Sequence, residues 1–183
     1  MSSLFSMVNG LTRGYGVIII FGSFLFSILY RDTKNLIFTL FLLKTDILNH
    51  ILKVYVAKPL MKNDKWPLLG YGKRPGTNVI SSPFPPDIPS KSYGMPSGHS
   101  QFAWTFSTYW MWKIWDDKQR TDLEKWSSII LLAGIAYLVA YSRVKWMKCH
   151  TTQQVVVGGI IGVGLGTGIY KFLKQFRKDM TYI

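Results

Sequence analysis

Long apolar segments separated by short polar ones restrict most strongly how this 183-residue chain can fold. Residues 14–30 carry no charge over 17 positions, close to the shortest length that crosses a bilayer as a helix. A signal-peptide core is the alternative, but no small-residue cleavage pattern follows and a second apolar segment begins almost at once. Further apolar segments occupy residues 36–57, 102–115, 127–141 and 155–173. We therefore predict an all-α membrane bundle, a single domain with about five transmembrane helices.

Two of these segments have features of their own. Charged side chains interrupt residues 36–57, among them Lys53, and such groups usually face a protein interior or a water-filled cavity. Lys53 lies near the end of its segment, so snorkelling to the interface is the alternative. In the last segment Gly158, Gly162 and Gly166 recur every four residues, which predicts a stripe for close helix contact.

The region between the second and third segments, residues 58–93, is unsuited to crossing a membrane. It contains seven of the eight prolines and several lysines, and loops of this length are usually functional or disordered. Apolar and aromatic residues within it predict a loop packed on the membrane face: Trp66, Leu68, Leu69, Tyr71 and Phe84.

A turn-rich stretch, residues 92–102 (SYGMPSGHSQF), leads from this loop into the third segment. Pro96 fixes its own φ, and Gly98 allows a ligand to approach the backbone closely. Ser97, Gly98 and His99 are expected at a helix N-terminus, where free N–H groups favour an anion. A simple capping turn is the alternative for an isolated Pro-Ser-Gly-His sequence.

The charge of the chain favours anionic partners. Its formal net charge is +13, from 22 Lys and Arg against 9 Asp and Glu. With apolar spans between the basic segments, we expect a lipid phosphate or diphosphate substrate and the bilayer as partners, and no nucleic acid. The carboxylates are scattered and Cys149 is the only cysteine, so we expect neither a metal site nor another cofactor.

Counting the expected helices places two of the polar loops relative to one another. Two expected crossings separate the loop carrying Arg74 and His99 from the loop carrying Arg143 and His150. An even number of crossings returns the chain to the same side. The two histidines and two arginines are therefore predicted to meet at one membrane face.

Three separated sequence elements resemble the signature of the type-2 phosphatidic acid phosphatase superfamily, and its dolichyl diphosphatase branch in particular. The elements are Lys53 with Arg74-Pro75, then Pro96-Ser97-Gly98-His99, then Ser142-Arg143 with His150. The flanks of the middle motif (YGMPSGHSQF) and the run HTTQQV from His150 are similar to that branch. The resemblance covers residues 30–162.

The chain departs from the signature at three points. Position 67, seven residues before Arg74, is proline, so Lys53 is taken as the counterpart lysine after an insertion, with Lys65 as its rival. Six residues instead of five separate Arg143 from His150. The final aspartate position is Gln154, which can accept a hydrogen bond from a histidine without adding charge.

The resemblance implies a metal-independent phosphatase in which His150 attacks phosphorus and His99 protonates the leaving oxygen. Arg143 and Arg74 would hold phosphate oxygens together with Lys53, Ser97 and the Gly98 N–H, and Gln154 would orient His150. A helix cap for His150 and a membrane-interface anchor for Arg143 are the structural alternatives.

A polyprenyl (dolichyl) diphosphate is the expected substrate. The alternatives are a phosphatidate or other lipid monophosphate phosphatase and a catalytically inactive, lipid-binding membrane scaffold. Lys and Arg number ten on the expected site side and ten on the other. If several site-side cations serve phosphate, the positive-inside rule favours a multi-pass protein with a lumenal site, for which we expect the endoplasmic reticulum.

Overall fold

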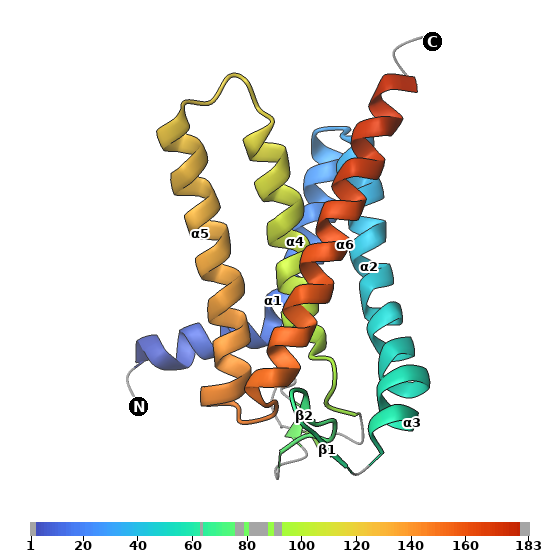
Figure 1. Cartoon of the computed structure of the whole chain (residues 1–183). Helices are drawn as coiled ribbons and strands as arrows, with labels where there is room; N and C mark the ends of the chain where they lie inside the picture. The colour runs from blue at the N-terminus through green and yellow to red at the C-terminus, as the bar shows by residue number, and fades with distance from the viewer. Residues whose placement is uncertain (1–2, 63, 76–78, 81–87, 90–92, 180–183) are drawn as a thin grey trace.

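The computed structural model describes residues 3–62, 64–75, 79–80, 88–89 and 93–179. Its long helices are α1 (Ser3–Leu29), α2 (Thr33–Ile51), α4 (Gly98–Trp115), α5 (Asp122–Tyr141) and α6 (Thr152–Asp179), with a short α3 (Lys58–Met61). Leu52–Ala57 and Ser142–Trp146 are π-helical turns. Two antiparallel pairs are formed by β1 (Lys65–Trp66) with β2 (Gly70–Tyr71) and by β3 (Val79–Ile80) with β4 (Ile88–Pro89). The prediction of an all-α bundle is confirmed (Figure 1).

Four helical stretches of the described residues are long and apolar enough to cross a membrane: Met7–Leu29, Thr33–Met61, Asp122–Trp146 and Thr152–Gln175. Helix α4 is less apolar because it lies at the centre of the bundle, in contact with α1, α2, α5 and α6. Polar side chains on its buried surface, such as Thr105 and Ser107, are covered by protein instead of lipid. This explains its lower hydropathy.

Several helices are longer than their apolar segments predict. Helix α1 begins at Ser3 instead of residue 14, and the second helical rod continues without a break to Met61. Helix α5 begins at Asp122 because Thr121 and Glu124 form a capping box ahead of the apolar segment. The added ends contain polar or charged residues, such as Asn9, Lys58 and Asp122, so hydropathy alone predicts helices that are too short.

The predicted glycine stripe is confirmed as the contact between α4 and α6. A Cβ on Gly158, Gly162 or Gly166 would lie 2.5, 2.4 or 2.6 Å from a carbonyl oxygen of the facing chain. Those carbonyls belong to residues 97, 101 and 105, which also recur every four residues. The two backbones therefore touch along three turns, and no side chain fits between them.

The segment after α3 folds back as the β1–β2 hairpin below the bundle (Figure 1). Leu69 packs against Met61 and Met95, whereas Leu68 and Tyr71 are exposed. Phe84, Lys91 and Ser92 lie outside the described residues. The expected packing of this loop on the membrane face stays a prediction.

Candidate active site

The end of α5 and the starts of α4 and α6 come together at the end of the bundle beside the β1–β2 hairpin (Figure 1), and these segments carry most of the polar residues singled out in the sequence. The guanidinium Nη1 of Arg74 lies 3.2 Å from His150 Nε2 and also donates to the Cys149 carbonyl at 3.3 Å. The imidazole of His150 is within electrostatic range of Lys53 and Arg143 as well. The predicted meeting of the two loops at one face is thus present in the structure.

Both π-helical turns carry one of these cations. Lys53 lies in the turn that extends α2, and Arg143 in the turn that extends α5. In the second turn the Met147 N–H donates to the Ser142 carbonyl at 2.9 Å, a spacing of five residues. A π turn contains one more residue than an α turn. The connection from Arg143 to His150 therefore begins with a turn one residue longer than an α turn.

The connection to His150 is closed by the Arg143 carbonyl. It accepts from the Cys149 N–H at 3.0 Å and from the His150 N–H at 3.2 Å. The arginine and the histidine are therefore linked by backbone hydrogen bonds. These bonds fix the position of the His150 backbone relative to Arg143.

The tautomer of His150 follows from its two partners. An arginine has donors only, so Nε2 must accept from Arg74 and the ring proton must lie on Nδ1. Nδ1 is 2.9 Å from Gln154 Oε1, which accepts that proton's hydrogen bond. The lone pair of the neutral ring consequently lies on Nε2, facing the cations.

The orientation of the Gln154 amide is fixed independently. Its Nε2 donates to the carbonyls of Tyr71 at 2.9 Å and Lys73 at 2.8 Å, at the end of the hairpin. Only Oε1 is left for His150, because the amide nitrogen cannot accept. The backbone carbonyl of Gln154 also accepts from the Ser97 N–H at 3.0 Å. One side chain thus links the histidine, the hairpin and the start of α6.

Burial keeps His150 neutral. Desolvation lowers the pKa of the imidazole to about 3, with the positive charge of Arg74 acting in the same direction and the Gln154 hydrogen bond opposing both. The ring is 3% exposed. A neutral imidazole with its lone pair on Nε2 is the form that can act as a nucleophile once the hydrogen bond from Arg74 is given up.

Helix α1 contributes backbone groups that the sequence analysis did not anticipate. Arg143, which is fully buried, donates through Nη2 to the Thr12 carbonyl and through Nη1 to Met147 Sδ at 3.3 Å. The imidazole of His99 hydrogen-bonds to the backbone of Arg13. No side-chain pattern signals a carbonyl acceptor, so these contacts had no sequence signature.

The turn at the start of α4 contains a buried hydroxyl group, that of Ser97. Ser97 is the N-cap residue, is 0% exposed, and its Oγ has no hydrogen-bond partner within the described part of the chain. A buried hydroxyl without a partner is costly and unusual. Its position beside the first N–H groups of α4 suits an anionic oxygen.

Asn49 supports this turn from below. Its amide donates to Gln101 Oε1 at 2.9 Å and to the Pro96 carbonyl at 3.4 Å, and Gln101 donates onward to the Thr45 carbonyl at 3.1 Å. A Cβ on Gly98 would lie 2.9 Å from Asn49 Oδ1. Glycine is therefore required for the turn to rest on α2.

Comparison with known proteins supplies the family. Residues 32–178 match the PAP2 superfamily. The chain belongs to this superfamily. Dolichyldiphosphatase 1 of Homo sapiens is 38% identical over 96 residues, covering 46% of this chain and 40% of the relative. Dolichyldiphosphatase of Saccharomyces cerevisiae is 33% identical over 112 residues, covering 61% and 46%.

These alignments span less than half the length of the curated relatives. A third, Dolichyldiphosphatase 1 of Callithrix jacchus, is 38% identical over 109 residues, which cover 54% of this chain and 45% of the relative. No solved structure shows a significant match to the chain. The resemblance to the dolichyl diphosphatase branch is nevertheless confirmed.

Within the superfamily signature, the structure separates the two candidates for the first lysine. Lys53 is 8% exposed and lies within electrostatic range of Arg74 and His99. Lys65 is exposed on strand β1.

Among the described residues, no three His, Cys, Asp or Glu side chains gather into a group suited to a metal ion.

Proposed function

We propose that this protein is a membrane lipid phosphatase that hydrolyses a polyprenyl diphosphate through a phosphohistidine on His150. The observation that carries the proposal is the arrangement of His150, whose Nδ1–H is held by Gln154 and whose Nε2 faces Arg74. A neutral imidazole is thereby oriented as a nucleophile among cations that would bind a phosphate.

In the first step, His150 Nε2 attacks the terminal phosphorus, and the bond from that phosphorus to the bridging oxygen breaks. Arg74, Arg143 and Lys53 hold the non-bridging oxygens, with Ser97 Oγ and the Gly98 N–H donating as well. Burial and the positive charge of Arg143 lower the pKa of His99, and the negative charge of the bound diphosphate would raise it again, so that the diphosphate complex takes up a proton on His99. His99 then gives this proton to the departing bridging oxygen, which leaves as the polyprenyl monophosphate. The ring of His150 becomes positively charged, and Gln154 keeps its hold on Nδ1–H.

In the second step, water attacks the phosphohistidine. His99, now neutral, accepts a proton from that water, the phosphorus–nitrogen bond breaks, and inorganic phosphate leaves. Both histidines return to their starting states. The protein groups named here suffice for charge and proton balance, so we propose that the reaction requires no metal.

The substrate proposal is supported by the relatives, whose names are those of dolichyl diphosphatases. The membrane-spanning helices suit a lipid substrate, since the site lies at one end of the bundle. We also propose that residues 1–183 act as a single domain, and that the site faces the lumen of the endoplasmic reticulum.

Phosphate release in detergent tests the proposal. Wild type, His150→Ala and His50→Ala are assayed with a long-chain polyprenyl diphosphate in the presence of EDTA. We expect release by the wild type and by His50→Ala, whose histidine is exposed on α2, and none by His150→Ala. Loss of wild-type turnover in EDTA would contradict the metal-free mechanism.

The intermediate is tested separately with substrate labelled at the terminal phosphate. We expect an acid-labile, base-stable phosphoprotein in the His99→Asn variant, because a phosphate leaving group departs without a proton more readily than water attacks without a base, so hydrolysis of the intermediate is slowed more than its formation. The label should be missing when His150 is also replaced. Equal labelling in the double variant would reject His150 as the nucleophile. Separately, faster release of phosphate from phosphatidate than from a polyprenyl diphosphate would favour the lipid monophosphate as the substrate.

A further inference from the structure

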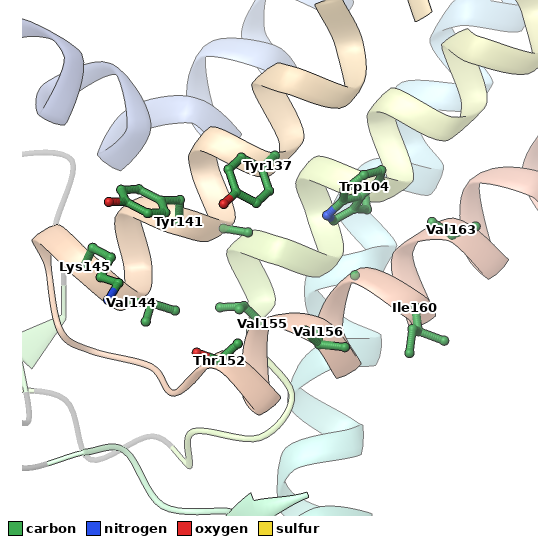
Figure 2. Close-up of a pocket in the computed structure, with 12 residues that line it drawn as sticks. Trp104, Tyr137, Tyr141, Val144, Lys145, Thr152, Val155, Val156, Ile160 and Val163 are labelled. Carbon is green, nitrogen blue, oxygen red and sulfur yellow. The ribbon is translucent and has the colours of Figure 1, made fainter. Parts of the chain in front are cut away.

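An apolar groove lies next to the catalytic end, between α5 and α6. Its volume is about 580 Å³, and Figure 2 shows Trp104 of α4 at its floor, with Tyr137 and Tyr141 on one wall and Ile160 on the other. Apart from Lys145 and Thr152, the lining residues are aliphatic, aromatic or glycine. The groove therefore offers hydrocarbon contact along its length and polar contact at one end.

The groove follows from how the three helices pack. Helix α4 packs closely against both α5 and α6. Figure 1 shows α5 and α6 diverging from each other toward the far end. Gly159 keeps the floor open, because a Cβ there would lie 3.0 Å from Trp104 Cδ1. The hollow is thus a property of the backbone arrangement.

The polar end of the groove adjoins the catalytic residues. Thr152 is two residues from His150, and Val155 follows Gln154 directly. On the other wall, Lys145 is two residues from Arg143 in the same π-helical turn. From Thr152 the groove runs to Val163, about 16 Å at the rise of an α-helix.

We propose that this groove holds the first isoprene units of the substrate's polyprenyl chain, with Lys145 beside the phosphate that stays on the lipid. The proposal rests on the proposed function and adds the tail-binding site to it. Continuity with the catalytic end decides the occupant, because a diphosphate bound at His150 must send its hydrocarbon chain into the membrane nearby. A positive side chain at the mouth matches the negative phosphate next to that chain.

The shape of the groove also favours one chain over two. It is a single channel between two helices, and aromatic faces line it on both the floor and a wall. A polyprenyl lipid has one branched chain to place there. A diacyl lipid has two, and the second would have to lie on the outer surface of α5 or α6. The groove is therefore expected to favour a lipid with one prenyl chain over a lipid with two acyl chains.

Tryptophan substitutions test the groove. Val156→Trp and Ile160→Trp fill it, whereas Ile130→Trp places the same ring on α5 outside it. Ile160 and Ile130 are matched, with exposed fractions of 68% and 67%. For each variant, kcat/KM is measured for a long-chain polyprenyl diphosphate and for isopentenyl diphosphate, which has one isoprene unit.

We expect the ratio of the two kcat/KM values to fall about tenfold or more in the groove variants, because several methylene groups lose apolar contact. The ratio should stay at the wild-type value in Ile130→Trp. An unchanged ratio in both groove variants would assign the groove to bulk lipid and overturn the proposal. So would a changed oligomeric state with an unchanged ratio, which would assign the groove to a second copy of the chain.

A photoreactive polyprenyl diphosphate analogue provides a measurement on the unsubstituted protein. We expect label on α6 between Thr152 and Val163 and on α5 near Tyr137; label confined to α1 and α2 would overturn the proposal. A wild type that cleaves neither diphosphate would instead reject the proposed function and this inference with it. The two failures are therefore distinguishable.

Discussion

His150 Nδ1 lies 2.9 Å from Gln154 Oε1, and the same glutamine donates through Nε2 to two carbonyls at the end of the β1–β2 hairpin. The amide cannot turn around without placing its NH₂ group against a ring N–H and its oxygen against carbonyl oxygens. The hairpin therefore determines which nitrogen of the histidine carries the proton. Gln154 thus holds the proton on His150 Nδ1 by its hydrogen bond, whereas the aspartate of the signature would add a negative charge as well.

Replacing this glutamine tests that arrangement. Gln154→Met keeps the length of the side chain but removes both functions of the amide, so His150 can take either tautomer. We expect kcat for polyprenyl diphosphate to fall about 100-fold, in the range seen when a histidine loses its orienting partner. The control is Gln153→Met at the exposed neighbouring position, which should retain kcat. Equal losses in both would point to a folding defect.

The pH dependence of kcat/KM reports the state of His150 in the free enzyme. Burial lowers the pKa of His150 to about 3, and in the proposed mechanism the neutral form is the nucleophile. Activity should therefore persist as the pH falls through 6.5, the ordinary pKa of histidine, and be lost only well below it. Arg74→Gln removes a positive charge that helps to lower the pKa of His150. The loss of kcat/KM at low pH should therefore occur at a higher pH in this variant. An acidic midpoint near 6.5 in the wild type would contradict this account.

Ser97→Ala separates catalysis from stability. The Ser97 hydroxyl is buried without a partner in the described structure, so its removal should leave the melting temperature unchanged or slightly raised. Loss of its donated hydrogen bond to phosphate should lower kcat/KM about tenfold. In the control Ser100→Ala, the lost bond is to the Val155 carbonyl at 2.6 Å. That variant should lose about 1 kcal/mol of stability instead.

The identity of the phosphate-binding lysine is tested by a pair of variants. Lys53→Met removes a buried cation near Arg74 and is expected to lower kcat/KM about 10- to 100-fold, as for a hydrogen bond to a charged group. Lys65→Met changes an exposed residue of the hairpin and should have little effect. The reverse pattern of phosphate release would assign the signature lysine to Lys65.

The contact between α4 and α6 is tested by Gly162→Ala with Gly164→Ala as its match. A methyl group at Gly162 would meet the Gln101 carbonyl at 2.4 Å, whereas nothing lies within 4 Å of a Cβ at Gly164. We expect Gly162→Ala to lower the free energy of unfolding by about 1–3 kcal/mol through overpacking. Gly164→Ala should be neutral or stabilising by up to about 1 kcal/mol. Thermal unfolding in detergent measures both.

The sequence predicted the parts of this molecule that depend on local pattern. Hydropathy located the helices, and the parity of crossings brought Arg74, Arg143 and His150 to one face. The glycine period predicted the α4–α6 contact because helical geometry converts a four-residue repeat into a stripe. The π-helical turn that carries Arg143 was not predicted from the sequence.

The contacts that the sequence did not predict depend on tertiary structure. The carbonyls of Thr12 and Arg13 reach the site because α1 passes beside the ends of α4 and α5. Backbone acceptors are the same in every residue, so no choice of amino acid marks them. The burial of Lys53 likewise depends on the hairpin, which brings Arg74 back across a gap of 20 intervening residues.

The glycine stripe of α6 also fixes how the two histidines are placed. Helices α4 and α6 touch backbone to backbone over three turns, with His99 in the first turn of α4 and His150 two residues before α6. Arg143 lies in the π-helical turn that extends α5. A change in the distance between α5 and the α4–α6 pair would therefore change the distance from Arg143 to both histidines.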